Sequence, residues 1–164
     1  MIAALNGNCL GGGMEIAMAS HYRIAAKGIQ VGQPEVQSGL IPGAGGTQRL
    51  PRLVGLPDAL KMIATGQPIS SEEGLEKGCL DEVVPPESLL EKALGAVQRF
   101  ISGELNHRDR MTRLRKDRLP NFVTKKMIIS FARGEAEKKG KGYIAPFKAI
   151  EAMERGLSDD FEAD

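Results

Sequence analysis

Two glutamates in apolar surroundings, Glu15 and Glu35, are the residues of this sequence that could share acid–base chemistry. Glu15 follows the triple glycine 11–13 after one residue, Met14, and Glu35 lies between Pro34 and a second glycine-dense turn at 43–46. Two carboxyl groups in differing apolar environments can hold different protonation states, as paired acid and base catalysis requires. These two stretches are therefore the candidate site.

A glycine turn that opens a helix presents backbone N–H groups, because the first four have no partner within the helix. The helix dipole adds about half a positive charge at the same end, which suits a phosphate or a developing oxyanion. The sequence at 43–48, GAGGTQ, has no Lys followed by Ser or Thr, and Gln48 stands where a dinucleotide fingerprint has its third glycine. An oxyanion hole at 11–13 with Glu15 beside it is the better interpretation of the glycines.

A plainer interpretation of both acids stays open at this point. Glu15 would interact with the dipole of its own helix from the first turn, and Glu35 would be a solvated loop acid. Residue types and spacing alone favour this plainer interpretation over catalysis.

Other chemistries find less support. His21 and His107 are the only histidines, so no histidine-rich metal site is expected, and the sequence contains no Gly-x-Ser-x-Gly elbow. Cys9 and Cys79 lie far apart, which indicates neither a disulfide framework nor a metal spacing and favours a reducing compartment. The basic run at 108–126 could bind phosphates, but it lacks interleaved aromatic residues and is interpreted as a solvated helical face.

The length and charge of the chain set bounds on its class. With 164 residues it is about the size of one domain and can bury a core. Lys plus Arg number 22 against 21 for Asp plus Glu, so no global charge calls for a nucleic-acid partner. No apolar run approaches the roughly 20 residues of a membrane helix, and no signal-peptide pattern opens the sequence.

Periodicity and turn residues predict alternating strands and helices. Expected strands are 2–5, 22–26, 29–31 and 80–84. Expected helices are 14–20, 47–54, 58–65, 71–77, 89–101, 122–139 and 146–155, the second of them limited or interrupted by Pro51. A capping box at Ser70 and glycine caps at 66 and 78 are the sharpest end signals, and the glycines at 39–46 are expected to exclude regular structure.

Taken together, GGGMEIAM, GQPEVQSGLIPGAGGTQRL and TGQPISSEEGLEKGCLDEVV make the chain resemble the crotonase superfamily, specifically the enoyl-CoA hydratases, over residues 1–84. The resemblance implies an α/β fold, a crotonase-like spiral of small β-sheets and helices with its amino-terminal part missing, followed by a helical carboxyl-terminal region. It places the crotonase core at 1–103, and 104–164 as a helical region leading toward a linker and a missing downstream domain.

The resemblance also implies roles for four residues. Glu15 corresponds to the acid that activates the water adding to C3 of the substrate, and Glu35 to the acid that delivers a proton to C2. Gly12 corresponds to one of two N–H donors to the thioester oxygen, and Gly43 to a glycine lining the pocket near the water. No metal is implied. The second donor lies in the amino-terminal half that this chain is expected to lack, which would leave the fragment weakly active or inactive.

The stretch KGKGYIAPFKAIEAMERGL near the carboxyl end resembles the segment after the hydratase domain of multifunctional fatty-acid oxidation enzymes. The implied activity is syn hydration of trans-2-enoyl-CoA to 3-hydroxyacyl-CoA, with an acyl-CoA thioester as substrate and no cofactor. NAD would serve only a missing dehydrogenase domain. The expected setting is bacterial cytoplasm or an organelle matrix, as a homo-oligomer or packed against the missing domains. The alternatives are a Δ3-Δ2-enoyl-CoA isomerase and a non-catalytic structural or oligomerisation module.

Overall fold

Small parallel and mixed sheets occupy the amino-terminal half of the chain. The computed structural model describes residues 1–107, 110–112, 115–139 and 142–157. Within these ranges, one sheet has the order β1 (Ile2–Leu5), β3 (Tyr22–Ala26), β6 (Glu82–Val84), with all strands parallel. In the other, β4 (Gln30–Gly32) pairs parallel with β2 (Cys9–Leu10) and antiparallel with β5 (Ile69–Ser70). The α/β class expected from the sequence is confirmed.

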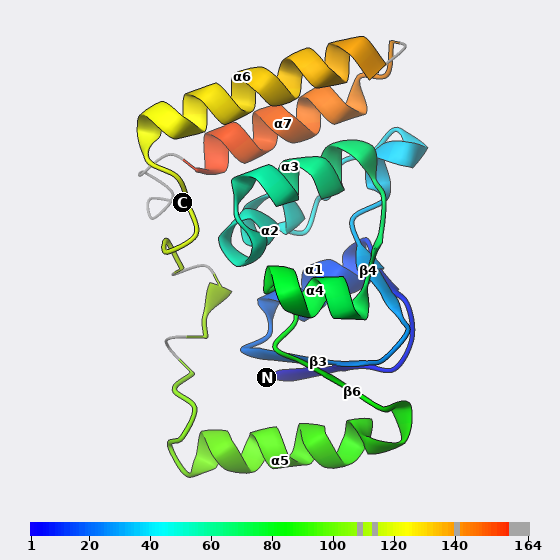
Figure 1. The fold of residues 1–164 in the computed structure, drawn as a ribbon, viewed down its shortest axis with the longest axis vertical. Coiled ribbons are helices and arrows are strands. Elements are labelled where there is room, and N and C mark those ends of the chain that lie inside the picture. Colours follow the sequence, from blue (N-terminus) through cyan, green and yellow to red (C-terminus); the bar gives the residue numbers. More distant parts are fainter. Residues whose placement is uncertain (108–109, 113–114, 140–141, 158–164) are drawn as a thin grey trace.

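Helices form layers above and below these sheets (Figure 1). Their bounds are α1 (Gly12–Ala19), α2 (Gly46–Val54), α3 (Leu56–Thr65), α4 (Ser71–Lys77), α5 (Leu89–Ile101), α6 (Phe122–Lys139) and α7 (Ala145–Gly156), with 3₁₀ turns η1 (Glu35–Ser38) and η2 (Pro86–Ser88). The α6–α7 pair lies at one end of the molecule, next to α2 and α3, and α5 lies at the opposite end beyond β1 and β3 (Figure 1). One buried apolar cluster connects α1, α2, α3 and α7 through the layers.

Strand β3 shows why these residues form a central strand. All five of its residues are buried, and a short apolar run buried on both faces is typical of a parallel sheet. Its register with β1 runs from Ile2 opposite Tyr22 to Leu5 opposite Ala25. The strand ends just before the Lys27–Gly28 turn, where Gly28 takes a φ of 84°.

The helix-end signals read from the sequence are confirmed. Ser70 caps α4, and its hydroxyl oxygen accepts a hydrogen bond from the N–H of Glu73 at 3.1 Å. Gly66 ends α3 and Gly78 ends α4, both in the left-handed conformation that a residue without Cβ adopts freely. Local chemistry therefore fixes the ends of these two helices.

Two expectations for the middle of the chain are corrected. Helix α2 begins at Gly46, inside the stretch expected to exclude regular structure, and it continues through Pro51 to Val54. Proline removes one N–H donor, but the buried apolar face of α2 holds the helix together. The sequence also missed β2 and β5, because strands of two residues are too short to show a period.

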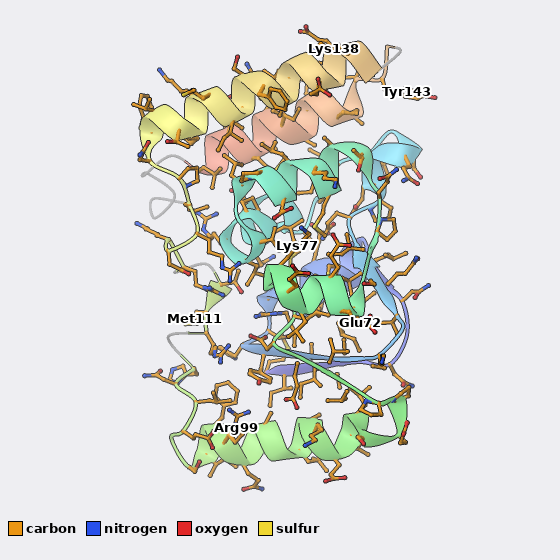
Figure 2. The ribbon with its side chains drawn as sticks, viewed as in Figure 1. Glu72, Lys77, Arg99, Met111, Lys138 and Tyr143 are labelled. Carbon is orange, nitrogen blue, oxygen red and sulfur yellow. The ribbon has the colours of Figure 1, made fainter. Side chains whose placement is uncertain are left out.

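The basic segment between α5 and α6 is not the solvated helical face expected from its composition. Its described residues run along one side of the molecule, with Met111 midway (Figures 1 and 2), and helix α6 begins only at Phe122. Arg110 pairs with Asp81, and Arg118 donates to the carbonyl of Lys77. These two cations therefore connect the segment to the core. Residues 108–109 and 113–114 of this segment, and the acidic end 158–164, lie outside the described residues.

A buried ion pair lies beside strand β3. The side chains of Arg23 and Asp81 are 1% and 7% exposed, and Arg23 Nη2 lies 2.7 Å from Asp81 Oδ2. The same oxygen accepts from the backbone N–H of Arg23 at 2.8 Å, and Oδ1 accepts from Arg110. Burial lowers the pKa of Arg23, and the charge of Asp81 opposes that shift. Asp81 thus compensates a cation that the strand carries into the core.

No helix within the described ranges has the length and apolar character needed to cross a bilayer.

Candidate active site

Glu15 is a buried carboxylate on the first turn of α1. Only 4% of the residue is exposed, and its neighbours Met14, Ala17 and Met18 on the same helix are buried apolar residues. A charge in such surroundings requires hydrogen-bond donors, because burial without them is costly. The donors of Glu15 come from another element of the chain.

The first turn of α2 supplies those donors. Glu15 Oε1 accepts hydrogen bonds from the backbone N–H groups of Ala44 at 2.8 Å and Gly46 at 2.7 Å. These groups belong to the glycine turn and to the first residue of α2, where N–H groups lack helical partners and the dipole favours an anion. Arg49 of α2 in turn donates to the Ala44 carbonyl at 2.6 Å and holds the turn. Glu15 is therefore fixed by the amino-terminal end of α2, a role that the interpretation as a partner of its own helix did not include.

Glu35 lies close to the glycine turn that opens α1. It is half-buried at the start of η1, and a Cβ placed on Gly11 would lie 3.3 Å from its Oε1 atom. The Gly11 N–H donates to the carbonyl of Gly32 at 3.0 Å, which ties this turn to the end of β4. Burial raises the pKa of Glu35, and the negative charge of Glu15 raises it further. Glu35 is therefore not the solvated loop acid of the plainer interpretation.

Gln33 lies between the two acids and was missed by the sequence analysis. The residue is fully buried. With its amide nitrogen turned toward Glu35, it donates to Oε1 at 2.8 Å and to Oε2 at 3.1 Å. Its amide carbon lies 3.0 Å from a Cβ built on Gly46, the residue that also donates to Glu15. The only sequence signal for it was an amide directly after the end of β4 and two residues before Glu35.

The two predicted glycines lie at the surface of the site. Gly12 is exposed at the first position of α1, and no described residue accepts a hydrogen bond from its N–H. Gly43 is also exposed and comes directly before Ala44, a donor to Glu15. An open N–H at a helix start can bind a ligand oxygen. Gly43 thus adjoins a donor of Glu15 in the chain.

This arrangement supports acid–base chemistry on a ligand by two carboxyl groups of unequal character. Glu15 is held by two fixed N–H donors, and Glu35 has a raised pKa that favours its protonated form. A pair of this kind can place a base and an acid beside one ligand. The exposed Gly12 N–H would add a donor for a developing negative charge.

Gly46 lies against both Glu15 and Gln33. Gly46→Ala is therefore a direct test of the packing of the site. A new Cβ would lie 2.8 Å from Pro42 Cβ, 2.9 Å from Glu15 Oε1 and 3.0 Å from Gln33 Cδ. We expect overpacking to cost about 1–3 kcal/mol of the free energy of unfolding, although alanine favours helix by about 1 kcal/mol. Urea unfolding measures the change.

The matched control is Gly95→Ala in α5, where a Cβ meets nothing within 4 Å. That variant is expected to gain up to about 1 kcal/mol from helix propensity. Equal gains for both variants would contradict the tight packing around Gly46.

The raised pKa of Glu35 predicts a pH-dependent stability. The folded chain binds the Glu35 proton more tightly than the unfolded chain, in which glutamates have a pKa of about 4.3. The free energy of unfolding therefore falls as pH rises from that value through the raised pKa of Glu35. We expect Glu35→Gln to be more stable than the parent chain at neutral pH, with the difference vanishing below the ordinary glutamate pKa.

Urea unfolding at neutral and acidic pH measures this effect, with the exposed Glu76→Gln of α4 as the control. The control is expected to change stability by less than about 0.5 kcal/mol at either pH. A Glu35→Gln variant that is less stable than the parent at neutral pH would show that the Glu35 charge is not penalised by burial.

Comparisons with known proteins show to which family the sequence of this chain is similar. The enoyl-CoA hydratase/isomerase family model matches residues 1–137. A glyoxysomal fatty acid beta-oxidation multifunctional protein of Brassica napus is 43% identical over 158 residues, which is 95% of this chain and 21% of the relative. The fatty acid oxidation complex subunit alpha of Pseudomonas putida (strain GB-1) is 42% identical over 159 residues, 96% of this chain and 22% of the relative.

The chain thus spans about a fifth of the length of these curated relatives. Among solved structures, the enoyl-CoA hydratase from Bacillus anthracis superposes with a TM-score of 0.61 at 33% identity, over 94% of this chain and 51% of that one. This likeness confirms the crotonase-like α/β fold expected from the sequence.

Proposed function

The chain belongs to the enoyl-CoA hydratase/isomerase family, and on this basis we propose that its site adds water to a trans-2-enoyl-CoA thioester to form a 3-hydroxyacyl-CoA. The observation that carries the proposal is the pairing of Glu15, held by two backbone donors, with Glu35, whose pKa is raised. An isolated acid could move a double bond, but adding water requires both a base for the water and an acid for carbon.

Each step assigns one proton to one residue. Glu15 removes a proton from the water while the water oxygen bonds to C3, and Glu35 gives its proton to C2. The electrons of the double bond form the new C2–H bond by way of the thioester enolate. The Gly12 N–H donates to the thioester oxygen as that negative charge develops. After product release, Glu15 gives its proton to solvent and Glu35 takes one up from solvent, which restores the base and the acid.

Gly43 borders the same site. It is exposed immediately before the residues that donate to Glu15. Because glycine has no side chain, it would leave room for the attacking water. In this proposal the hydration needs no cofactor or metal, and the acyl-CoA thioester is the only ligand. The relatives named above come from a plant glyoxysome and from a bacterium, which supports an organelle matrix or a bacterial cytoplasm as the setting.

The names of the relatives also support a place in fatty-acid β-oxidation within a longer multifunctional polypeptide. The division at 103–104 between a crotonase core and a helical region, and packing against further domains or a second copy, remain part of this proposal. A NAD-dependent dehydrogenase domain would lie outside the residues of this chain.

The experiment that tests the proposal offers two substrates to the full-length encoded polypeptide. Hydration of crotonyl-CoA removes the absorbance of the conjugated thioester, and a 3-enoyl-CoA gains that absorbance if it is isomerised. We expect hydration to be the faster reaction. Isomerisation without hydration would replace the proposal by the isomerase alternative. The absence of both reactions would favour the non-catalytic module.

A further inference from the structure

Helix α2 makes different contacts at its two ends. Its first residue, Gly46, and the preceding turn donate to the Glu15 carboxylate. Farther along, it packs against α7, as the layers in Figure 1 show. A helix of nine residues spans only about 13 Å, so a displacement at one end is passed on to the other.

Gln48 and Gly156 interlock at the α2–α7 contact. A Cβ placed on Gly156 would occupy the position of the Gln48 side-chain amide, so only glycine leaves room for it. The Gln48 Nε2 atom donates to the Ala152 carbonyl of α7 at 3.0 Å. The side chain of Gln48 thus occupies the space beside Gly156 in the last turn of α7.

Arg52 makes a second link between the two helices. It is 4% exposed, and its Nη1 donates to the Gln48 carbonyl at 2.7 Å while Nη2 donates to the Gly156 carbonyl at 3.2 Å. A cation at the carboxyl end of α7 interacts favourably with its dipole. Burial of this guanidinium lowers the pKa of Arg52.

We infer that α7 fixes the position of α2 through Gln48, Arg52 and Gly156, and thereby holds the two N–H donors against Glu15. These three are positioning residues, because the donors to the Glu15 carboxylate are Ala44 and Gly46. The inference gives the carboxyl-terminal helix a part in the hydration, and for that it depends on the proposed function. The geometric part stands on the hydrogen bonds alone.

The physical reason is the short range of the bonds at Glu15. Hydrogen bonds of 2.7 and 2.8 Å weaken steeply when donor and acceptor separate or lose alignment. A misplacement of about 1 Å in a catalytic group can cost about a hundredfold in rate. A change in the position of α7 therefore acts on Glu15 by way of α2.

The test replaces Gly156 by alanine, with Gly134→Ala in α6 as the matched control. A Cβ on Gly134 meets nothing within 4 Å. Amide proton and nitrogen chemical shifts of Ala44 and Gly46 are read by NMR in the 164-residue chain, and Glu15→Gln identifies the part of each shift that depends on the carboxylate. We expect Gly156→Ala to move both amide resonances and Gly134→Ala to leave both in place.

Removal of the obstructing side chain provides the rescue. In the double variant Gln48→Ala/Gly156→Ala the new methyl group has room, so both amide resonances should return toward the parent positions. In the full-length polypeptide, kcat for crotonyl-CoA should fall about tenfold to a hundredfold in Gly156→Ala with KM unchanged, and recover in the double variant.

Each other outcome is decisive. Lower thermal stability in Gly156→Ala with unmoved Ala44 and Gly46 resonances would overturn the inference, because α7 would then be structural only. If Gly156→Ala does not fold, Arg52→Met, which removes the hydrogen bond to the Gly156 carbonyl, decides by whether it shifts the same two resonances. An inactive parent enzyme whose resonances respond as expected would count against the proposed function and leave the positioning role intact.

Discussion

Glu15→Gln is expected to slow hydration of a trans-2-enoyl-CoA by about 10²–10⁴-fold, the usual contribution of a general base. The glutamine oxygen can still accept from the N–H groups of Ala44 and Gly46, which hold the carboxylate in the parent. Geometry is therefore preserved, whereas an amide cannot take the proton of the attacking water. The loss should appear in kcat, measured with crotonyl-CoA at saturation in the full-length polypeptide.

The exposed Glu76→Gln is the matched control for this change of charge, and it should leave kcat unchanged. A Glu15→Gln enzyme within a factor of two or so of the parent would show that Glu15 is not the base, since even a modest general base contributes about a hundredfold.

Asp81→Ala is expected to lower the free energy of unfolding by about 3–5 kcal/mol, because it leaves a buried cation without its partner. Arg23, the second residue of β3, is 1% exposed, and Asp81 accepts from its guanidinium and from its backbone N–H. The variant also removes the carboxylate that Arg110 contacts, which would release the segment between α5 and α6. Urea unfolding of the 164-residue chain measures the loss.

Asp58→Ala provides the comparison at the surface. Asp58 accepts from Lys77 at 2.8 Å, but these side chains are 38% and 23% exposed, and Lys77 of α4 is labelled in Figure 2. Pairs of this kind contribute about 0–1 kcal/mol. Losses of equal size in the two variants would contradict the account of Arg23 as a buried, compensated charge.

Local signals in the sequence predicted much of the fold. The periodicity of residues 89–101 predicted α5, a helix was also expected at 122–139 where α6 lies, and the capping box at Ser70 gave the start of α4. These features depend on neighbouring residues, so they can be read from a single sequence. Strands of two residues and a helix that continues through Pro51 depend on packing partners far along the chain, and they were missed.

The same distinction applies to the site. Spacing singled out Glu15 and Glu35, and family resemblance supplied their roles, which remain predictions. The donors of Glu15 are separated from it by 29 and 31 residues in the sequence. No local pattern predicts such a contact. The amide of Gln33 against Glu35 and the Arg23–Asp81 pair are likewise products of the tertiary fold. A charged residue within an apolar strand was the one available signal for the ion pair.

The measurement that tests the central claim most directly is crotonyl-CoA hydration by the double variant Glu15→Gln/Glu35→Gln. It is followed as loss of the conjugated thioester absorbance in the full-length polypeptide. The control is Glu76→Gln/Glu91→Gln, which changes the same charge at two exposed positions. The two-carboxyl account predicts a control as active as the parent and a double variant with no hydration above the reaction without protein. Hydration that survives in the double variant would contradict it.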